Sequence, residues 1–340
     1  MTRLPIIVFG AAGHTGRFVV AELHRRGWPL VIAGRDAAKL ELVRAAYPTA
    51  EPRLAAITDA AALDRALQGG SAVINCAGPF LDTAAPIIEA ALRARIHYVD
   101  VTAEQPSALA TFEQFARPAA AAGVAVVPAM GFYGGLGDLL ATAAMDDWQT
   151  ADEITLAVAL DSWHPTLGTR RTGERNTAAR RVVSNDQLTA LANPAPRRTW
   201  LFPAPFGAQQ VVGLPLTEII AISRHLRSPE IHSFMNLTPL DDLHKAETPP
   251  PAPADDRGRS AQVFLMEAVV RRGSSERRTH ARGRDIYAFT APLVVEAVER
   301  ILDGRRARTG TAAPGELFDA RDFLAALAPD LAPDLAVEYA

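Results

Sequence analysis

The chain has 340 residues, of which 49% are apolar and 21% charged, and its net charge at neutral pH is −3. This length predicts about two domains, the slightly acidic balance disfavours nucleic acid as a partner, and no apolar run approaches the roughly eighteen residues of a membrane span. The single cysteine, Cys76, excludes an internal disulfide, and the N-terminus lacks the pattern of a signal peptide, so we expect a cytoplasmic protein without a membrane partner.

Short apolar runs rich in β-branched residues alternate with segments of helical periodicity in the first part of the chain. The runs predicted as strands are 4–10, 29–34, 52–57, 71–78, 97–102 and 124–131. The segments predicted as helices are 17–26, 37–46, 60–67, 84–94, 107–121 and 136–145. Parallel strands need crossover helices, which cover both faces of the sheet. The alternation therefore predicts an α/β fold, a Rossmann-like doubly wound parallel sheet.

Longer strands replace this alternation after about residue 146. The predicted strands are 153–163, 218–226, 230–237, 261–272 and 276–289. The turn within 271–278 predicts an antiparallel hairpin, and the proline-rich stretch 246–260 predicts an exposed loop. These patterns indicate a second α+β domain built on a mixed or antiparallel sheet.

Two helical segments, 290–304 and 316–327, follow these strands. We expect them to pack back on the first domain, which would make that domain discontinuous. The predicted division is a nucleotide-binding domain over 1–130, a substrate and dimerisation domain over 131–284, and C-terminal helices over 285–340.

Three glycines, Gly10, Gly13 and Gly16, stand where the first strand passes into the first helix. A helix N-terminus offers unpaired N–H groups and the positive end of the helix dipole to an anion. Gly10 allows a tight turn, Gly13 lets a pyrophosphate approach the main chain, and Gly16 permits close packing of helix on strand. Such spacing also suits a purely structural turn, but at the head of six strand–helix units it predicts dinucleotide binding. The intervening residues expected at this site are Ala12, His14 and Thr15.

The second strand ends in Gly34 and Arg35, which bears on the choice of dinucleotide. NAD sites usually place a carboxylate here for the ribose 2′-hydroxyl, whereas NADP sites offer an arginine to the 2′-phosphate. Asp36 could serve as that carboxylate, but we interpret it as the N-cap of the following helix. The sequence therefore favours NADP(H) over NAD(H).

Five stretches resemble the saccharopine dehydrogenase-like reductases in their NADP-binding half: VFGAAGHTGR, VIAGRD, VINCAGPF, YVDVTAE and VPAMGFYGGLGDLLA. The resemblance implies a nicotinamide-dependent oxidoreductase with a mixed α/β substrate domain that often makes a dimer. Relatives act on C=N or C–N bonds, and the trans-acting enoyl reductases act on C=C bonds. A homodimer and a small-molecule substrate are therefore expected.

This chain departs from the family pattern after the sixth strand, where relatives often have Gly-Phe-Asp-Ser and a proline. Here the residues are Gly131, Phe132, Tyr133, Gly134 and Gly135. Lysine occurs only at two positions, Lys39 and Lys245, which argues against a saccharopine-cleaving mechanism with a lysine base.

Two other classes of dehydrogenase are disfavoured by the residues. No tyrosine is followed by a lysine four positions later, so the Tyr-x-x-x-Lys pair of the short-chain dehydrogenases is absent. One cysteine and scattered histidines give no metal-ligand cluster.

The chemistry of an open parallel sheet lies beyond the carboxyl ends of its strands. We expect Gly78 and Pro79 to face the nicotinamide and its ribose. Cys76 and Ala77 precede them at the strand exit, where Cys76 reads either as a small buried residue or as a nucleophile. Asp100, at the next strand end, either caps a turn or contacts substrate, and Glu104 has the same two readings.

Two further residues join Asp100 as catalytic candidates, Tyr133 and His164. Tyr133 either delivers a proton or packs at the domain junction, and the glycines that follow it suit an anion site or a hinge. His164 begins a basic segment, 164–175, that suits an anionic substrate or a solvated loop. His225 is interpreted as a core or interface residue on a strand.

Two functions remain open from the sequence. The first is an NADP(H)-dependent oxidoreductase that transfers hydride to or from a C=N, C=C or C=O bond. The second is a sensor or scaffold that binds NADP(H) without turnover, since a fold alone does not guarantee catalysis.

Overall fold

A seven-stranded parallel sheet organises the first part of the molecule in the computed structural model, which describes residues 3–328 and 330–334. In spatial order its strands are β15 (Gly310–Thr311), β6 (Ala125–Val127), β5 (His97–Asp100), β4 (Ala72–Asn75), β1 (Ile6–Phe9), β2 (Leu30–Gly34) and β3 (Glu51–Leu54). Every neighbouring pair is parallel. The predicted Rossmann-like sheet is confirmed, with a short late strand, β15, added at its edge.

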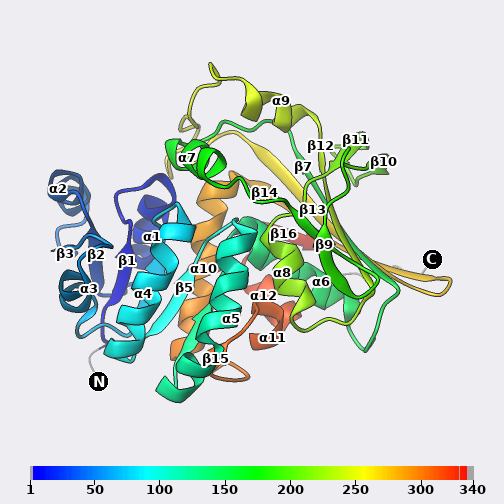
Figure 1. The fold of residues 1–340 in the computed structure, drawn as a ribbon. Coiled ribbons are helices and arrows are strands. Elements are labelled where there is room, and N and C mark those ends of the chain that lie inside the picture. Colours follow the sequence, from blue (N-terminus) through cyan, green and yellow to red (C-terminus); the bar gives the residue numbers. More distant parts are fainter. Residues whose placement is uncertain (1–2, 329, 335–340) are drawn as a thin grey trace.

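Helices cover both faces of this sheet (Figure 1). They are α1 (His14–Arg25), α2 (Ala37–Ala46), α3 (Ala60–Leu67), α4 (Phe80–Ala94) and α5 (Gln105–Ala122). Successive side chains of a strand point to opposite faces. Ile6 and Val8 of β1 accordingly share a core with α1 and α2, while Ile7 and Phe9 share one with α3, α4 and α5. Asp36 caps α2 by accepting a hydrogen bond from the Lys39 N–H at 3.1 Å, as predicted.

The second sheet is mixed and has nine strands. They are β7 (Glu153–Leu160), β8 (Arg181–Ser184), β9 (Gln187–Ala190), β10 (Arg197–Leu201), β11 (Ala208–Gly213), β12 (Glu230–Asn236), β13 (Val263–Arg272), β14 (Ser275–Arg284) and β16 (Leu331–Asp334). Only β7 and β12 pair in parallel among these described strands. The predicted hairpin is β13–β14, closed between Arg272 and Ser275.

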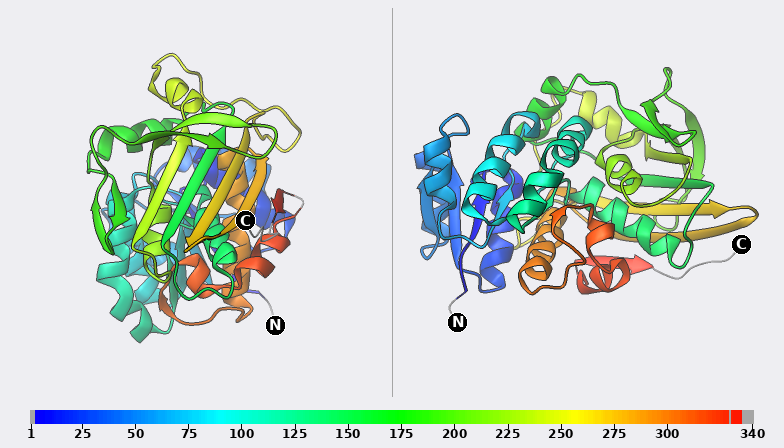
Figure 2. Two further views of the ribbon diagram at one scale, coloured as in Figure 1. Left: turned by 90° about the vertical axis from the view of Figure 1, so that its right-hand side faces the viewer. Right: turned by 60° about the horizontal axis from the view of Figure 1, so that its bottom comes forward.

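Three short helical elements cover one face of the second sheet, and the left view of Figure 2 shows no helix on the other face, where a smaller apolar cluster includes Ala157, Leu265 and Trp200. The covering elements are the π-helical turn η1 (Phe132–Leu136), α6 (Gly137–Met145) and α8 (Thr217–Ser223). Two further helices, α7 (Leu167–Arg175) and α9 (Thr238–His244), lie in the connections of this domain near the top of Figure 1.

The chain returns to the first sheet through α10 (Ile286–Leu302), which packs along α1. Arg26, after α1, donates to Glu296 of α10 at 2.9 Å and also pairs with Glu299, and the Trp28 indole N–H donates to Glu299 at 2.7 Å. The last helices, α11 (Pro314–Leu317) and α12 (Ala320–Ala326), contact α6 instead. The final part of the predicted C-terminal segment, 335–340, lies outside the described residues.

Two predictions for the second domain are wrong. The run 218–226, expected as a strand, forms α8, whose isoleucines Ile219, Ile220 and Ile222 are all buried. A short apolar run buried on every side carries no periodicity that separates helix from strand. His225 therefore follows a helix, and the basic segment read as a loop contains α7.

Candidate cofactor and substrate site

The strand order reverses between β1 and β4, and the glycine turn lies at this switch point. Gly10 has φ +82°, a conformation open mainly to glycine. A Cβ atom there would lie 2.8 Å from the Ala77 nitrogen beyond β4. The two loops expected to hold a dinucleotide are thus in direct contact, where open α/β sheets bind ligands.

The N-terminus of α1 is free to bind an anion. Gly13 is its N-cap and contributes no side-chain hydrogen bond, so N–H groups of the first turn point out of the sheet edge. A Cβ at Gly16 would lie 2.2 Å from the Gly10 carbonyl oxygen, so glycine alone permits this close packing. Ala12 and Thr15 are half-buried in the same turn.

His14 closes one side of this turn. Its ring lies edge-on to Phe18 and to Tyr287 of α10, each with centroids 5.3 Å apart. Its Nε2 atom is buried and has no hydrogen-bond partner among the described residues. Burial lowers the pKa of His14, so the ring is neutral at pH 7 and has one unused polar atom beside the anion-binding N-terminus.

The tip of β2 offers an arginine beside the same turn. Gly34 ends the strand, and Arg35 is exposed, with no hydrogen bond or ion pair to another described residue. An exposed guanidinium held by a strand end can form two charge-assisted hydrogen bonds to a phosphate. The glycine turn, the orphaned His14 atom and Arg35 together fit a phosphorylated dinucleotide.

The loop after β4 is held by a buried carboxylate. Glu104 accepts the N–H groups of Phe80 at 2.7 Å and Leu81 at 3.0 Å, so it caps α4 across the loop. Burial raises the pKa of Glu104, and these two N–H groups oppose that rise. The capped loop contains Gly78, which is exposed, and Pro79, which is half-buried.

Cys76 lies half-buried at the start of this loop. Burial, with a smaller contribution from Asp100, raises the pKa of its thiol well above the usual range. The thiol is therefore neutral at pH 7, which disfavours a nucleophile.

Asp100 is wholly buried and hydrogen-bonded throughout. One carboxylate oxygen accepts the N–H groups of Thr102 at 3.0 Å and Ala129 at 2.8 Å, and the other accepts the Tyr98 hydroxyl at 2.9 Å. Burial raises the pKa of Asp100 to about 6, while these donors stabilise its charged form. The carboxylate thus ties β5 to the end of β6, and its predicted contact with a substrate stays a prediction.

Tyr133 differs from Asp100 in that its buried polar atom is not hydrogen-bonded within the described part of the chain. Its side chain is only 9% exposed, and its hydroxyl is buried without a hydrogen-bond partner among the described residues. Its ring lies 6.0 Å from that of Trp163, whose indole N–H donates to the Tyr287 hydroxyl at 2.9 Å. Since Tyr287 also meets His14, a row of aromatic rings runs from the glycine turn to Tyr133.

Glu218 is a second buried group with an unused atom. The carboxylate is 2% exposed, and its Oε1 accepts the Leu216 N–H at 2.8 Å, while its Oε2 has no partner among the described residues. Burial raises the pKa of Glu218 to about 7, against the stabilising effects of the Leu216 N–H, the Ser233 hydroxyl and the charge of Arg180. Arg180 donates to the Pro215 carbonyl at 3.1 Å.

Helix α7 reaches from the second domain over the loop after β4. A Cβ at Gly78 would lie 3.3 Å from the Thr172 hydroxyl, and Thr172 makes a small contribution that lowers the pKa of Glu104 against the larger effect of burial. Arg175 forms an exposed ion pair with Asp82 at 3.1 Å. No residue of α7 is buried, so polar contacts rather than a core hold this helix on the first domain.

Part of the basic segment that contains α7 forms hydrogen bonds within the protein. Arg170 donates to the Thr248 carbonyl at 2.9 Å and to that of Lys245 at 3.2 Å. His164 is half-buried beside Trp163. The predicted use of this segment for an anionic substrate stays a prediction.

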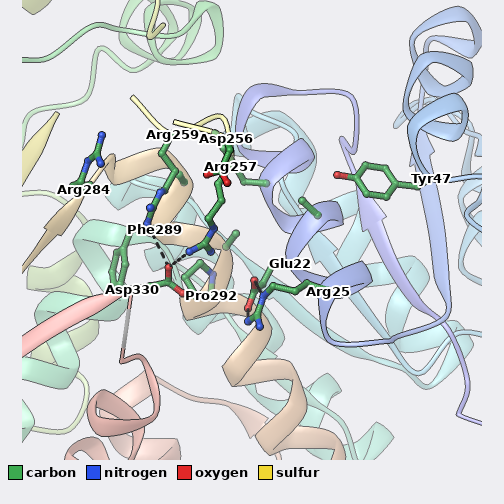
Figure 3. A pocket seen from close by; sticks show the side chains of 14 residues that line it. Glu22, Arg25, Tyr47, Asp256, Arg257, Arg259, Arg284, Phe289, Pro292 and Asp330 are labelled. Atoms are coloured by element: carbon green, nitrogen blue, oxygen red, sulfur yellow. Dashed lines mark hydrogen bonds and ion pairs between the residues drawn. The ribbon is translucent and has the colours of Figure 1, made fainter. Parts of the chain in front are cut away.

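A cavity of about 280 Å³ lies elsewhere, between the later turns of α1, α10 and the loop after residue 254 (Figure 3). Several of its charged groups pair with one another. Arg257 and Arg259 converge on Asp330, and Arg25 pairs with Glu22. No group of three metal-ligating side chains occurs within the described part of the chain, and none of its helices has the length and apolar character to cross a membrane.

Comparisons with known proteins agree with this geometry. Residues 6–127 match the family model of the saccharopine dehydrogenase NADP-binding domain. Residues 6–127 are thus similar to the NADP-binding domain of the saccharopine dehydrogenases. The resemblance expected from the sequence is confirmed, and NADP(H) is the cofactor that this domain assigns.

The curated relatives match this domain and little beyond it. The saccharopine dehydrogenase-like oxidoreductases of Bos taurus and Homo sapiens are each 30% identical, over 145 and 146 residues, which is 37% of this chain and 34% of each relative. The match thus spans about a third of the relatives' length. A structure of saccharopine dehydrogenase (L-Glu forming) from Saccharomyces cerevisiae is 11% identical and superposes with a TM-score of 0.68 over 97% of this chain and 100% of that one. This superposition shows a common fold across both domains.

Several residues of the site escaped the sequence analysis. Glu218 was assigned to a strand, although a lone carboxylate in an otherwise apolar run is a signal that could have singled it out. Tyr287, Trp163 and Arg180 carry no motif, and only the fold brings them to the glycine turn and Tyr133.

Proposed function

We propose that this chain is an NADP(H)-dependent oxidoreductase that moves a hydride to or from a C=N, C=C or C=O bond of a small molecule. The reaction would take place between the carboxyl edge of the parallel sheet and the second domain. The observation that carries the proposal is the buried hydroxyl of Tyr133, which lacks a partner and stands at the end of the aromatic row that begins at the glycine turn. Buried polar groups without partners are rare and call for an explanation such as a ligand.

Each part of the site has a defined task in this proposal. The α1 N-terminus and Arg35 bind the phosphates, and the loop at Gly78 positions the reactive ring. When bound, the nicotinamide supplies or accepts the hydride. The Tyr133 hydroxyl donates a proton, or a hydrogen bond, to the substrate atom that gains negative charge. Helix α7 and Trp163 exclude water from this atom.

Binding of the two dinucleotides to an Arg35→Ala variant tests the cofactor assignment. A charge-assisted hydrogen bond contributes about 1.5–3 kcal/mol, so we expect roughly ten- to hundredfold weaker binding of NADPH and little change for NADH. Arg44→Ala is the matched control, because Arg44 is an exposed arginine of α2 paired with Glu41. Equal losses for NADPH and NADH would contradict this placement of the 2′-phosphate.

Oxidation of NADPH with a panel of imines, enals and keto acids tests turnover. Consumption that is lost in Tyr133→Phe supports the oxidoreductase. Tight NADPH binding without consumption on any member of the panel would favour a sensor or scaffold instead.

A further inference from the structure

Helix α7 has no apolar core of its own. None of its nine residues is buried, and its one large apolar side chain, Leu167, is 63% exposed. Two of its residues are glycines, Gly168 and Gly173, which are among the weakest helix formers. A helix this short is unstable by itself in water, so contacts with the rest of the protein decide where α7 lies.

The second domain holds α7 from one side. The Trp163 N–H, before the helix, donates to the Asp242 carboxylate at 3.1 Å. Within the helix, Arg170 donates to the Thr248 carbonyl at 2.9 Å and to that of Lys245 at 3.2 Å. These acceptors lie in α9 or just after it, so α7 is attached to the second domain.

Polar contacts also reach from α7 to the first domain, over whose upper edge α7 lies in Figure 1. The Thr169 hydroxyl forms a hydrogen bond with the Tyr287 hydroxyl of α10 at 2.8 Å. Arg175 donates to Asp82, in the first turn of α4, at 3.1 Å. The side chains of Arg175 and Asp82 are 62% and 40% exposed. Exposed ion pairs contribute little to stability, so these contacts can break and re-form readily.

The loop at Gly78 lies under the middle of α7. A Cβ at Gly78 would lie 3.3 Å from the Thr172 hydroxyl, so α7 and the loop touch. The helix therefore covers this side of the loop. A dinucleotide that reaches or leaves the loop from this side can do so only when α7 moves away.

Tyr287 connects α7 to the other end of the cofactor site. Its hydroxyl contacts Thr169 and also accepts the Trp163 indole N–H at 2.9 Å. Its ring lies edge-on to that of His14, the first residue of α1, with centroids 5.3 Å apart. One side chain thus touches α7 through its hydroxyl and the glycine turn through its ring.

We propose that α7 is a lid over the nicotinamide end of the cofactor site, latched to the first domain by the Tyr287 hydroxyl and by Asp82. This inference rests on the proposed function, in which the loop at Gly78 positions the nicotinamide. The lid lifts to admit the dinucleotide and closes again, so the dinucleotide leaves only after both latches open. Thr169 and Arg175 are positioning residues, because they act by placing α7.

The deciding experiment measures the rate at which NADPH leaves the full chain, by stopped-flow fluorescence with an excess of NADP+ as competitor. We expect release to be about two- to fivefold faster in Asp82→Ala and in Arg175→Ala. The double variant should be no faster than either single one, since both remove the same ion pair. Tyr287→Phe keeps the ring against His14 but loses the hydroxyl contacts, and should release NADPH roughly fivefold faster or more.

Asp82→Ala separates a latch from simple electrostatics. Removal of a negative charge near an anionic cofactor would by itself slow release, whereas loss of a latch speeds it. Arg93→Ala is the matched control, because it removes an exposed ion pair, with Asp64, at the other end of α4. Its release rate should equal that of the wild type.

Hydrogen exchange of the α7 amide groups is the second measurement. NADPH should slow exchange over 167–175 by roughly tenfold in the wild type, and by much less in Tyr287→Phe. Release rates like the wild type in the latch variants, slower release from Asp82→Ala, or exchange in α7 that NADPH leaves unchanged would overturn the lid while leaving the oxidoreductase intact. Binding of NADPH without turnover would overturn the oxidoreductase and leave the lid, since both measurements require only binding.

Discussion

Buried polar groups at the edge of the parallel sheet and buried polar groups in the second domain differ in whether they find hydrogen-bond partners. At the carboxyl edge of the parallel sheet, both oxygens of Asp100 and of Glu104 accept hydrogen bonds from the protein itself. Across from them, Tyr133 and Glu218 each keep a buried atom without a partner. A buried polar group that forms hydrogen bonds stabilises the folded state, whereas a buried polar group without a partner destabilises it. The comparison suggests that the first pair maintains the scaffold and that the second is kept for a ligand.

Asp100→Ala should give the largest effect, and on stability rather than on chemistry. The substitution leaves two backbone N–H groups and the Tyr98 hydroxyl without their acceptor, and each buried donor so left costs about 1–3 kcal/mol. We expect roughly 3 kcal/mol or more to be lost from the free energy of unfolding, measured in urea. Asp100→Asn keeps one acceptor oxygen and should lose much less. An alanine variant as stable as the wild type would contradict the structural role assigned to Asp100.

The pH dependence of stability tests Glu218. Burial raises the pKa of Glu218 to about 7 in the native state, so its proton is held up to about that pH, whereas the unfolded chain releases it near the ordinary glutamate pKa of 4.5. The native state therefore binds more protons between these values, and the free energy of unfolding falls as pH rises through this window, by at most about 1.4 kcal/mol per pH unit.

This contribution is isolated by subtracting the urea-unfolding curve of Glu218→Gln from that of the wild type at each pH. Asp100 and His97 also titrate in the window and cancel in the difference. A difference that does not vary between pH 4.5 and 7 would show that Glu218 is ionised in the native protein.

The smallest effect on stability should come from Tyr133→Phe. Removal of a hydroxyl that has no partner sacrifices no hydrogen bond, so the free energy of unfolding should stay within about 0.5 kcal/mol of the wild type or rise slightly. Tyr98→Phe is the control, because the Tyr98 hydroxyl donates to Asp100 and accepts from Asn75, and it should lose about 1–2 kcal/mol. Equal losses in both variants would mean that Tyr133 has a structural partner after all.

The sequence predicted the glycine turn and the dinucleotide site, but it did not predict the surroundings of Tyr133. The difference has a physical reason. The glycine turn is built from backbone, and the close approaches at Gly10 and Gly16 exclude every side chain, so glycine itself records the geometry. The strand–helix alternation around it has clear periodicities. The fold class and the location of the dinucleotide were therefore readable.

The part of the site around Tyr133 is built from side chains that come from separate segments of the chain. Glu218 takes its buried position because 217–223 is a helix, whereas the mostly apolar pattern of this run predicted a strand. Arg180 comes from a connection with no regular pattern, and the partnerless state of an atom follows from packing alone. No local signal encodes such a meeting of distant residues.

The late position of α10 in the chain has a consequence for how the protein is made. Val19, Val20 and Leu23 of α1 are wholly buried in a core shared with α10, which ends only at Leu302. During synthesis the ribosome must therefore extend the chain as far as Leu302 before α10 can cover these apolar residues of α1. Domains generally fold as they emerge, the N-terminal one first. Here the nucleotide-binding domain cannot complete its core until α10 has been synthesised. Until then it exposes apolar residues that chaperones can bind.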